Sequence, residues 1–168
     1  DMGRIAGEAS GLAAGLVAPT LFYGDDPDVA QYANEWFRAF DGTWNFSYHQ
    51  RPRIEFIQPD SEELARERAV DLADSGFPVT FLEPAEVERE YPWFDASQFA
   101  GAVEYADTGW VDPYEYTVAL QKAAEERGAD VYSNTPVRDV TVEGGLAEVA
   151  VPEGSVSADH VVLATGWR

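Results

Sequence analysis

The C-terminal third of the sequence restricts the fold most, because it predicts one helix followed only by strands. Asp112 and Pro113 provide an N-cap and a first helical residue, and apolar residues then recur at helical spacing until Gly128. Alternating apolar and polar residues predict strands at 130–133, 137–142, 146–151 and 155–156. Gly144 and Gly145 predict a tight hairpin between two of these strands. This region is therefore predicted to form a helix and an antiparallel meander.

The final apolar run differs from the strands before it. Residues 161–164 read Val-Val-Leu-Ala without alternation and lead into Thr165 and Gly166. An unbroken apolar run predicts a strand that is covered on both faces. In open α/β sheets, ligands bind beyond the carboxyl ends of such strands, where glycine lets a phosphate or a ring approach the backbone. Because this strand ends where the sequence ends, we expect the chain to be part of a longer protein.

The first 24 residues are rich in glycine and alanine, with Gly7, Gly11, Gly15 and Gly24 among them. Small side chains permit close approach of backbones. Such an approach serves either helix packing or the binding of a flat ligand, and glycine alone does not decide between the two.

Residues 25–111 combine helix and strand signals. Asp26-Pro27 begins an amphipathic helix whose aromatic face indicates core packing and which is predicted to end at Gly42. Asp60 and Glu63 resemble a capping box for a second helix, which runs to Gly76. Strands are predicted at 44–48, 54–57, 79–82 and 102–106, a short helix at 84–90 and a loop at 109–111. The first two strands are expected to form a half-buried antiparallel pair.

The charge of the chain is strongly negative. It has 31 acidic and 11 basic residues, giving a net charge of −20, and Lys122 is its one lysine. Such a field repels nucleic acid and anionic membranes. The acids are spread along the chain, which predicts adaptation to concentrated salt, where screening weakens self-repulsion. An acidic binding surface and an ordinary solvated exterior are the alternatives.

The absence of cysteine excludes disulfides, thiolate metal sites and thiol nucleophiles. His49 and His160 lie far apart in sequence, so no metal site is expected unless carboxylates build it alone. No apolar run approaches the ~18 residues of a membrane span, and no signal peptide opens the chain. The chain is therefore predicted to be cytoplasmic, without a membrane span.

The order of these elements resembles the FAD-dependent oxidoreductases of the D-amino-acid oxidase superfamily, and most of all its glycine oxidase, sarcosine oxidase and glycerol-3-phosphate dehydrogenase group. The resemblance is strongest from Thr108 to Gly166 and extends to the small residues at 9–19. It implies a mixed α+β fold in which an antiparallel substrate-domain sheet with helices joins part of an FAD-binding α/β fold with a β-meander. The implied domains are 1–24 (FAD-binding), 25–108 (substrate-type) and 109–168 (FAD-binding).

The resemblance also implies where FAD would lie. The stretch from Ser10 to Gly15 would run along the flavin side of the cofactor, and the backbone of Val137 would lie against the adenine. Residues 164–166 would close over the phosphates. The implied cofactor residues are Ser10, Ala14, Gly15, Leu16, Val137, Ala164, Thr165 and Gly166. Two segments of small residues suit a long, flat, doubly phosphorylated ligand, so we expect residues 10–15 and 164–166 to converge.

Two elements of that family are missing from these 168 residues: the strand that enters G-x-G-x-x-G, and the C-terminal glycine-rich segment. The first of these supplies most phosphate contacts. We therefore expect the complete protein to bind FAD and act as an enzyme, and this chain alone to be inactive and to hold FAD poorly.

Three residues are candidates for substrate chemistry. His49 could accept a proton or contact an anion, Arg51 could bind a substrate carboxylate as a fork with Arg53, and Tyr105 could line the substrate cavity. Each has a structural alternative: a surface histidine, ordinary ion pairing and a core tyrosine. Asp107 and Asp112 flank Trp110 and are considered as a paired acid and base. For Asp112, capping of the helix that follows is the better explanation.

The implied reaction is hydride transfer from a small amine, amino acid or related substrate to FAD. The sequence leaves open whether electrons pass on to oxygen or to a partner protein, what the substrate is and how the protein oligomerises. The alternative function is a non-catalytic acidic binding or scaffold domain that retains the same fold.

Overall fold

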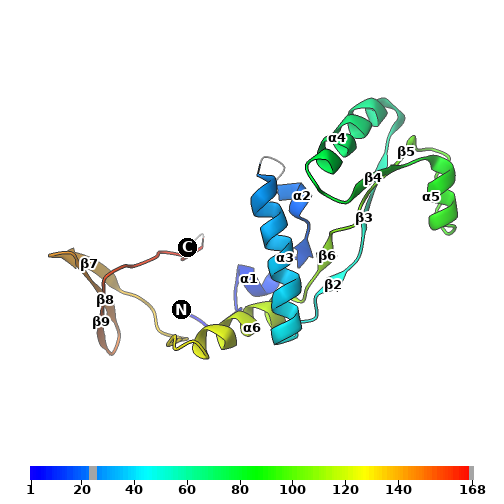
Figure 1. Ribbon diagram of the computed structural model, residues 1–168. Helices are drawn as coiled ribbons and strands as arrows, with labels where there is room; N and C mark the ends of the chain where they lie inside the picture. Colours follow the sequence, from blue (N-terminus) through cyan, green and yellow to red (C-terminus); the bar gives the residue numbers. More distant parts are fainter. Residues whose placement is uncertain (23–25, 167–168) are drawn as a thin grey trace. The chain divides into compact units, whose positions relative to one another are not determined.

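The structure is a computed structural model that describes residues 1–22 and 26–166, and side chains within 1–20 and 26–166 (Figure 1). The chain divides into one unit of Asp1–Ala14 with Pro113–Arg168 (unit 1) and one of Gly15–Asp112 (unit 2). Gly24 and the predicted boundary after residue 24 lie outside the described residues. Its helices and strands form a mixed α+β fold with three small antiparallel sheets, which confirms the predicted fold class.

The main sheet of unit 2 has the order β3 (Arg53–Ile57), β5 (Gly101–Tyr105), β4 (Val79–Leu82), and β5 pairs antiparallel with both neighbours. Phe56 lies opposite Ala102, and Phe81 opposite Val103. The predicted strands at 54–57, 79–82 and 102–106 are thus confirmed, the last with a shift of one residue.

One face of this sheet is covered by α4 (Glu62–Asp74), which places Ala69 and Leu72 against Phe77 and Val103 in a buried core. The predicted capping box of Asp60 and Glu63 is wrong. A 3-10 turn, η1 (Pro59–Ser61), precedes the helix and moves its N-cap to Ser61, whose side chain makes no capping bond. The chain leaves α4 as predicted, through Gly76, whose φ of +87° favours glycine.

The opposite face of the sheet is covered by α5 (Pro84–Glu90) and the residues that follow it. Glu83 and Glu86 form a capping box at the start of this helix, with the Glu83 amide donating to the Glu86 carboxylate at 3.0 Å. Val87 is fully buried, and the rings of Phe56 and Phe94 stack with centroids 3.9 Å apart. The main sheet is therefore packed on both faces.

The longest helix of the described residues, α3 (Pro27–Trp44), begins as predicted, with the Asp26 side chain accepting from the Val29 amide at 3.3 Å. It runs two residues past Gly42 to Trp44, and its C-cap Asn45 has a φ of +50°. The predicted strand at 44–48 is therefore wrong, and so is its pairing with 54–57. The Asp41 carboxylate accepts the Tyr48 amide at 3.1 Å, so that amide is not left for a sheet partner. A short helix, α2 (Pro19–Phe22), packs beside α3.

A second sheet of unit 2 joins three strands of two residues each: β1 (Leu16–Val17), β6 (Gly109–Trp110) and β2 (His49–Gln50), in that order. The loop predicted at 109–111 therefore contains the central strand of this sheet. Strands this short leave no alternation in the sequence to detect.

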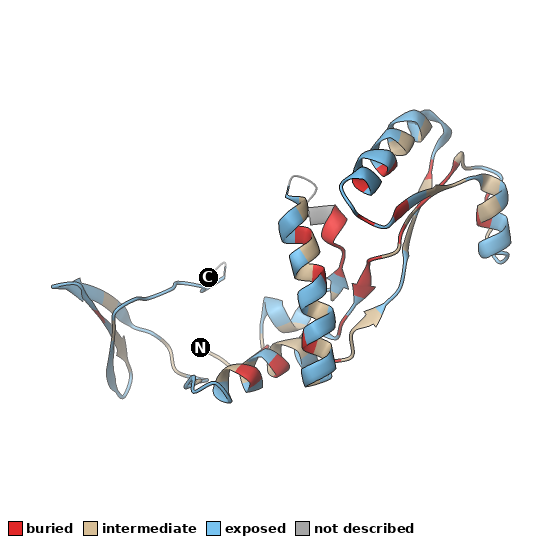
Figure 2. Ribbon diagram, viewed as in Figure 1, coloured by how far each residue is buried: buried red, intermediate tan, exposed pale blue. Residues whose placement is uncertain are grey.

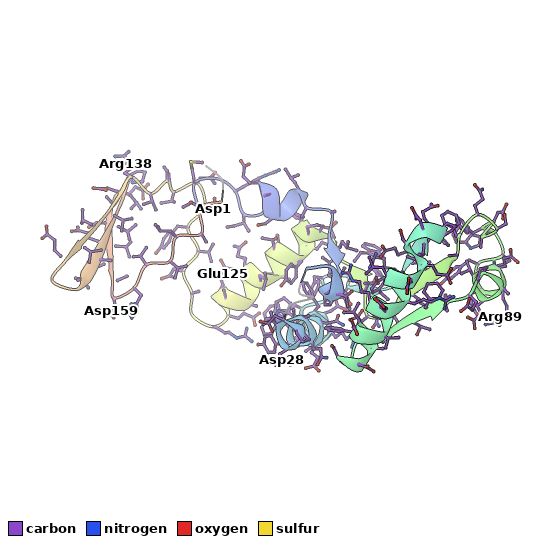
Figure 3. All side chains as sticks on the ribbon, turned by 90° about the horizontal axis from the view of Figure 1, so that it is seen from above. Asp1, Asp28, Arg89, Glu125, Arg138 and Asp159 are labelled. Carbon is purple, nitrogen blue, oxygen red and sulfur yellow. The ribbon has the colours of Figure 1, made fainter. Side chains whose placement is uncertain are left out.

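Unit 1 contains α1 (Ala9–Leu12) packed on α6 (Pro113–Glu125). Asp1, labelled in Figure 3, donates from its terminal amine to the Tyr132 carbonyl at 2.8 Å. The amide of Asn134 donates to the Gly3 carbonyl at 2.8 Å. The start of the chain and the segment after α6 therefore lie side by side.

The third sheet is the predicted meander of β7 (Asp139–Glu143), β8 (Leu146–Val151) and β9 (Gly154–Ala158), and Arg138 and Asp159 mark its ends in Figure 3. Gly144 and Gly145 have φ values of +60° and +85°, the conformation of a type I′ hairpin, as predicted. Almost all of its residues are exposed or half-buried (Figure 2).

Two predicted strands of unit 1 are wrong. Residues 130–133 and 161–164 form no strand, and Val162 and Leu163 are 88% and 74% exposed. A buried parallel strand requires neighbours that bond its backbone and cover both faces. The described part of the chain provides neither for 161–164, so this apolar run lies in extended, unpaired conformation.

Candidate functional site

The small sheet of unit 2 aligns three side chains from distant parts of the sequence. Trp110 lies opposite Leu16 on one side and His49 on the other, and directly opposite residues share a face of the sheet. The rings of His49 and Trp110 stack, with centroids 4.2 Å apart and planes 26° apart. Leu16 and Trp110 are each about half exposed. We call Leu16, Trp110 and His49 the Leu16 row.

The strand geometry behind this row depends on Gly109. A Cβ at this position would lie 2.6 Å from a Tyr48 ring carbon and 2.8 Å from the His49 carbonyl oxygen. Only glycine therefore lets β6 pair closely with β2 while the Tyr48 ring packs over position 109. This ring lies on the face of the sheet opposite the Leu16 row.

Hydrogen bonds tie β2 to the segment that leads into β6. The buried Thr108 hydroxyl lies 2.8 Å from the Arg51 carbonyl oxygen and 2.9 Å from that of Tyr105, so its proton is shared between two acceptors. The Arg51 amide donates to the Thr108 carbonyl at 3.1 Å, and the Gln50 side chain donates to the Ala106 carbonyl at 3.0 Å. These bonds fix the position of His49 relative to Trp110.

Tyr105 lies in β5 and is 4% exposed, within the core under α4 and not in the Leu16 row. The Arg53 guanidinium lies 3.8 Å above its ring, and its hydroxyl donates to Glu55 at 3.3 Å. Burial raises the pKa of Tyr105, and the Glu55 charge raises it further. The structure therefore places Tyr105 as a core tyrosine.

The two arginines considered as a carboxylate fork differ in their partners. Arg53 pairs with Glu55 at 3.0 Å. Arg51 is exposed, donates to the Gln50 carbonyl at 2.9 Å, and forms no ion pair among the residues that the structure describes. Of the predicted fork, only Arg51 keeps its charge available for a ligand.

The residues that the resemblance assigns to FAD are distributed over both units. Those in unit 1 are Ser10, Ala14, Val137, Ala164, Thr165 and Gly166, all of them exposed, and those in unit 2 are Gly15 and Leu16. Gly166 has a φ of +71° and open space around its Cβ position. The set carries two hydroxyls, small side chains and no acid, which suits a flat, anionic ligand.

Gly15 connects the implied cofactor stretch to the Leu16 row. Its φ is +72°, and its carbonyl accepts from the Val111 amide at 2.9 Å. Leu16 follows it as the first residue of the row. No local pattern predicts that His49 and Trp110 lie beside Leu16, because the strand register that joins them is a tertiary feature.

Comparison with known proteins decides the family. The family profile described as DAO, FAD dependent oxidoreductase, matches residues 1–168. The chain belongs to this family.

Individual members of the DAO family agree with this assignment. Glycine oxidase of Bacillus subtilis is 34% identical over 105 residues, which are 62% of this chain and 27% of that protein. The mitochondrial pyruvate dehydrogenase phosphatase regulatory subunit of Mus musculus is 21% identical over 170 residues, 99% of this chain and 19% of that protein. The chain thus matches about a quarter or less of these relatives' lengths.

A solved member shares the fold. The crystal structure of glycine oxidase from Geobacillus kaustophilus superposes with a TM-score of 0.84 at 22% identity, covering 99% of this chain and 47% of that one. The predicted resemblance to this group of FAD-dependent oxidoreductases is therefore confirmed at the level of family and fold.

The described ranges, 1–22 and 26–166, contain neither a metal-binding cluster nor a membrane-spanning helix. There, no three His, Asp or Glu side chains gather so as to hold a metal ion. No helix of those ranges is both long and apolar enough to cross a bilayer.

Proposed function

We propose that this chain supplies the substrate-type domain and part of the cofactor fold of an oxidoreductase that oxidises a small amine or amino acid by hydride transfer to FAD. The observation that carries the proposal is the match of the whole chain to the DAO family. The names of its glycine oxidase relatives point to an amino acid as the substrate class. FAD, when bound, supplies the hydride acceptor.

Within this proposal, the residues of the chain bind and orient. Ser10 and Thr165 offer hydroxyls, and the small residues around them leave room for a flat ring system. The Leu16 row offers an apolar and aromatic surface of unit 2 that would exclude water from one side of a substrate. Arg51, exposed beside His49, would bind a substrate carboxylate.

The test uses the full-length protein. The proposal predicts a yellow protein that binds FAD and is bleached by a small amino acid in the absence of oxygen. A colourless protein that takes up no FAD on reconstitution would overturn it.

The role of Arg51 is tested by Arg51→Gln, with Arg89→Gln as the matched control. Arg89 is also exposed but lies on α5, where it pairs with Glu90 at 3.2 Å. Loss of a charge-assisted bond to the substrate carboxylate is expected to raise KM about tenfold with a smaller change in kcat. The control variant keeps both constants. An unchanged KM in Arg51→Gln would remove Arg51 from the site.

The chain by itself is predicted to hold FAD poorly and to be inactive, because it lacks the glycine-rich first loop of the family. Titrating the isolated 168 residues with FAD and following flavin fluorescence tests this directly. Saturable micromolar quenching would show that the segment present here suffices for binding.

A second function is favoured by one relative. The match to the mouse pyruvate dehydrogenase phosphatase regulatory subunit spans 99% of this chain, and the name of that protein describes regulation. In this alternative the acidic fold binds a basic partner without catalysis. Such binding would weaken steeply as salt rises, whereas binding of FAD and a small substrate would change little.

We propose further that the acidic exterior is an adaptation to concentrated salt. With a net charge of −20, self-repulsion should decline as KCl is raised from about 0.1 M to about 1 M, where the Debye length falls from about 10 to about 3 Å. Urea midpoints that rise over this range would support the proposal, and midpoints that stay constant would contradict it. The cytoplasmic localisation remains a prediction.

A further inference from the structure

A polar recess lies within unit 2, on the side of α3, and none of the residues assigned above lines it. One face of α3 contributes Gln31, Asn34, Glu35 and Arg38, at positions i, i+3, i+4 and i+7 of the helix. The turn at 76–78 and the Asp107 side chain complete the lining. We call it the Asp107 recess.

Asp107 is the exceptional member of this lining. Its residue is 3% exposed, and its Oδ1 atom has no hydrogen-bond partner among the described residues. Burial raises the pKa of the Asp107 carboxyl, and the Arg38 charge partly offsets this. A buried carboxylate oxygen without a donor is costly, so a ligand that brings a donor to this atom would be strongly favoured.

The recess also holds one positive charge, that of Arg38. Arg38 is exposed and takes part in no ion pair within the described ranges. Its charge acts on two neighbours: burial raises the pKa of both Asp107 and Tyr48, and the Arg38 charge partly offsets that rise in each. Arg38 can therefore bind an anionic group while Asp107 binds a cationic one.

The amide groups of the recess have defined orientations. The Gln31 Nε2 donates to the Ser75 carbonyl at 3.0 Å. The Asn34 Oδ1 accepts from the Tyr48 hydroxyl at 3.4 Å, which leaves the Asn34 Nδ2 as a donor. With Arg38, this amide provides donors to the recess, and the Asp107 and Glu35 carboxylates provide acceptors.

This arrangement favours a ligand that carries both charges. Asp107 and Glu35 would repel a simple anion, and Arg38 would repel a simple cation. A molecule that carries both an ammonium and a carboxylate group satisfies both sets of atoms. We propose that the Asp107 recess binds a small amino acid as a zwitterion, with its ammonium group on Asp107 and its carboxylate group toward Arg38. This binding is independent of any flavin chemistry.

The test uses the full-length protein labelled with ¹⁵N-glycine, in which the Gly76 amide reports directly on the recess. Glycine is the probe for both groups, methylammonium chloride for the ammonium alone, sodium acetate for the carboxylate alone, and KCl for a metal cation. Glycine is expected to shift the Gly76 signal saturably. Each single-charge probe should bind at least about tenfold more weakly, as the loss of one charge-assisted bond predicts.

Two variants locate the binding. Asp107→Asn and Arg38→Gln should each weaken glycine binding about tenfold or more, whereas Glu63→Gln, an exposed acid of α4, should leave it unchanged. Circular dichroism checks folding, and because Arg38 is exposed, its variant remains informative if Asp107→Asn fails to fold.

Three outcomes would overturn the proposal. The first is that glycine causes no saturable shift of the Gly76 signal, and the second is that glycine shifts this signal in Asp107→Asn and Arg38→Gln as much as in the unmodified protein. The third is that KCl causes the same shift as glycine, which would show a cation site. Glycine bound at a flavin would instead change flavin absorbance without requiring Asp107 or Arg38. A colourless protein would refute the proposed oxidoreductase and leave this measurement intact.

Discussion

Two sheets of this protein share a hydrogen-bonding plan and differ in what covers them. The main sheet and the meander each contain three antiparallel strands with one central strand, β5 or β8. In β5 four of five residues are buried, whereas β8 buries one of its six. Helix α4 and the α5 segment cover the two faces of the main sheet, and nothing among the described residues covers the meander to a similar extent.

The difference shows that backbone pairing alone does not make a core. The alternation that predicted the meander strands is correct, yet their apolar residues remain largely exposed: Val142, Leu146 and Val156 are 69%, 47% and 53% exposed. Burial arises only where helices bring a second apolar layer onto a sheet. Local stability should therefore be concentrated in unit 2.

The largest expected effect on stability comes from matched leucine-to-alanine substitutions, one in the main sheet's core and one in the meander. Leu72→Ala removes a side chain that is 8% exposed in the α4 core, and should lower the free energy of unfolding by about 2–5 kcal/mol. Leu146→Ala in β8 should cost less than about 1 kcal/mol, because little apolar area is lost. Urea unfolding measures both, and equal losses would break the comparison.

A smaller effect is expected from glycines that differ in their surroundings. Gly109→Ala places a methyl group against the Tyr48 ring and the His49 carbonyl, and should destabilise unit 2 by about 1–3 kcal/mol. Gly42→Ala, inside α3 with open space around it, should stabilise by up to about 1 kcal/mol. Thermal unfolding distinguishes the two variants, because the midpoint should fall for Gly109→Ala and rise for Gly42→Ala. A neutral Gly109→Ala would show that the small sheet adjusts.

The hairpin of the meander should respond through its backbone and not through packing. Gly145→Ala forces an alanine to a φ of +85° and should cost about 1–2 kcal/mol locally. Gly144→Asn is the control, since asparagine tolerates the left-handed conformation. Hydrogen exchange of β7 and β8 amides measures the local effect. Faster exchange in both variants would contradict a type I′ turn.

The smallest expected effect concerns Tyr91, whose hydroxyl donates to Glu104 of β5 at 2.9 Å. Burial, together with that bond, raises the pKa of Tyr91 from 10.0 to about 12. Because the fold favours the neutral phenol, the resulting stabilisation is complete below pH 10 and is lost as pH rises toward about 12. Tyr91→Phe should remove one late-titrating tyrosine from an absorbance titration. An unchanged titration would place the perturbed group elsewhere.

The elements that the sequence predicted well are those with local signals. The Asp26-Pro27 and Asp112-Pro113 pairs precede α3 and α6, and Gly144-Gly145 lies at the predicted hairpin. Capping, proline position and positive φ act within a few residues, so they can be seen without knowledge of the fold. The same holds for the length of β8, which is bounded by the turn residues Gly144-Gly145 and Pro152-Glu153.

The site required information of another kind. Nothing in the sequence relates Leu16, His49 and Trp110, because two-residue strands carry no period and their register depends on how β1 and β2 meet β6. The Asp107 recess is a second example, since it joins a face of α3 to a turn and a loop far along the chain. The sequence indicates Asp107 as an acid or base only through its neighbours, whereas its burial is a tertiary feature.

The sequence by itself determined the charge, the absence of cysteine chemistry, most element types and, through its residues from Thr108 to Gly166, the family. Tertiary structure alone decided which strands pair, which sheet is covered and which apolar run stays exposed. The physical reason is range: caps and turns are satisfied by atoms a few residues away, whereas burial and register depend on surfaces that only the folded chain brings together.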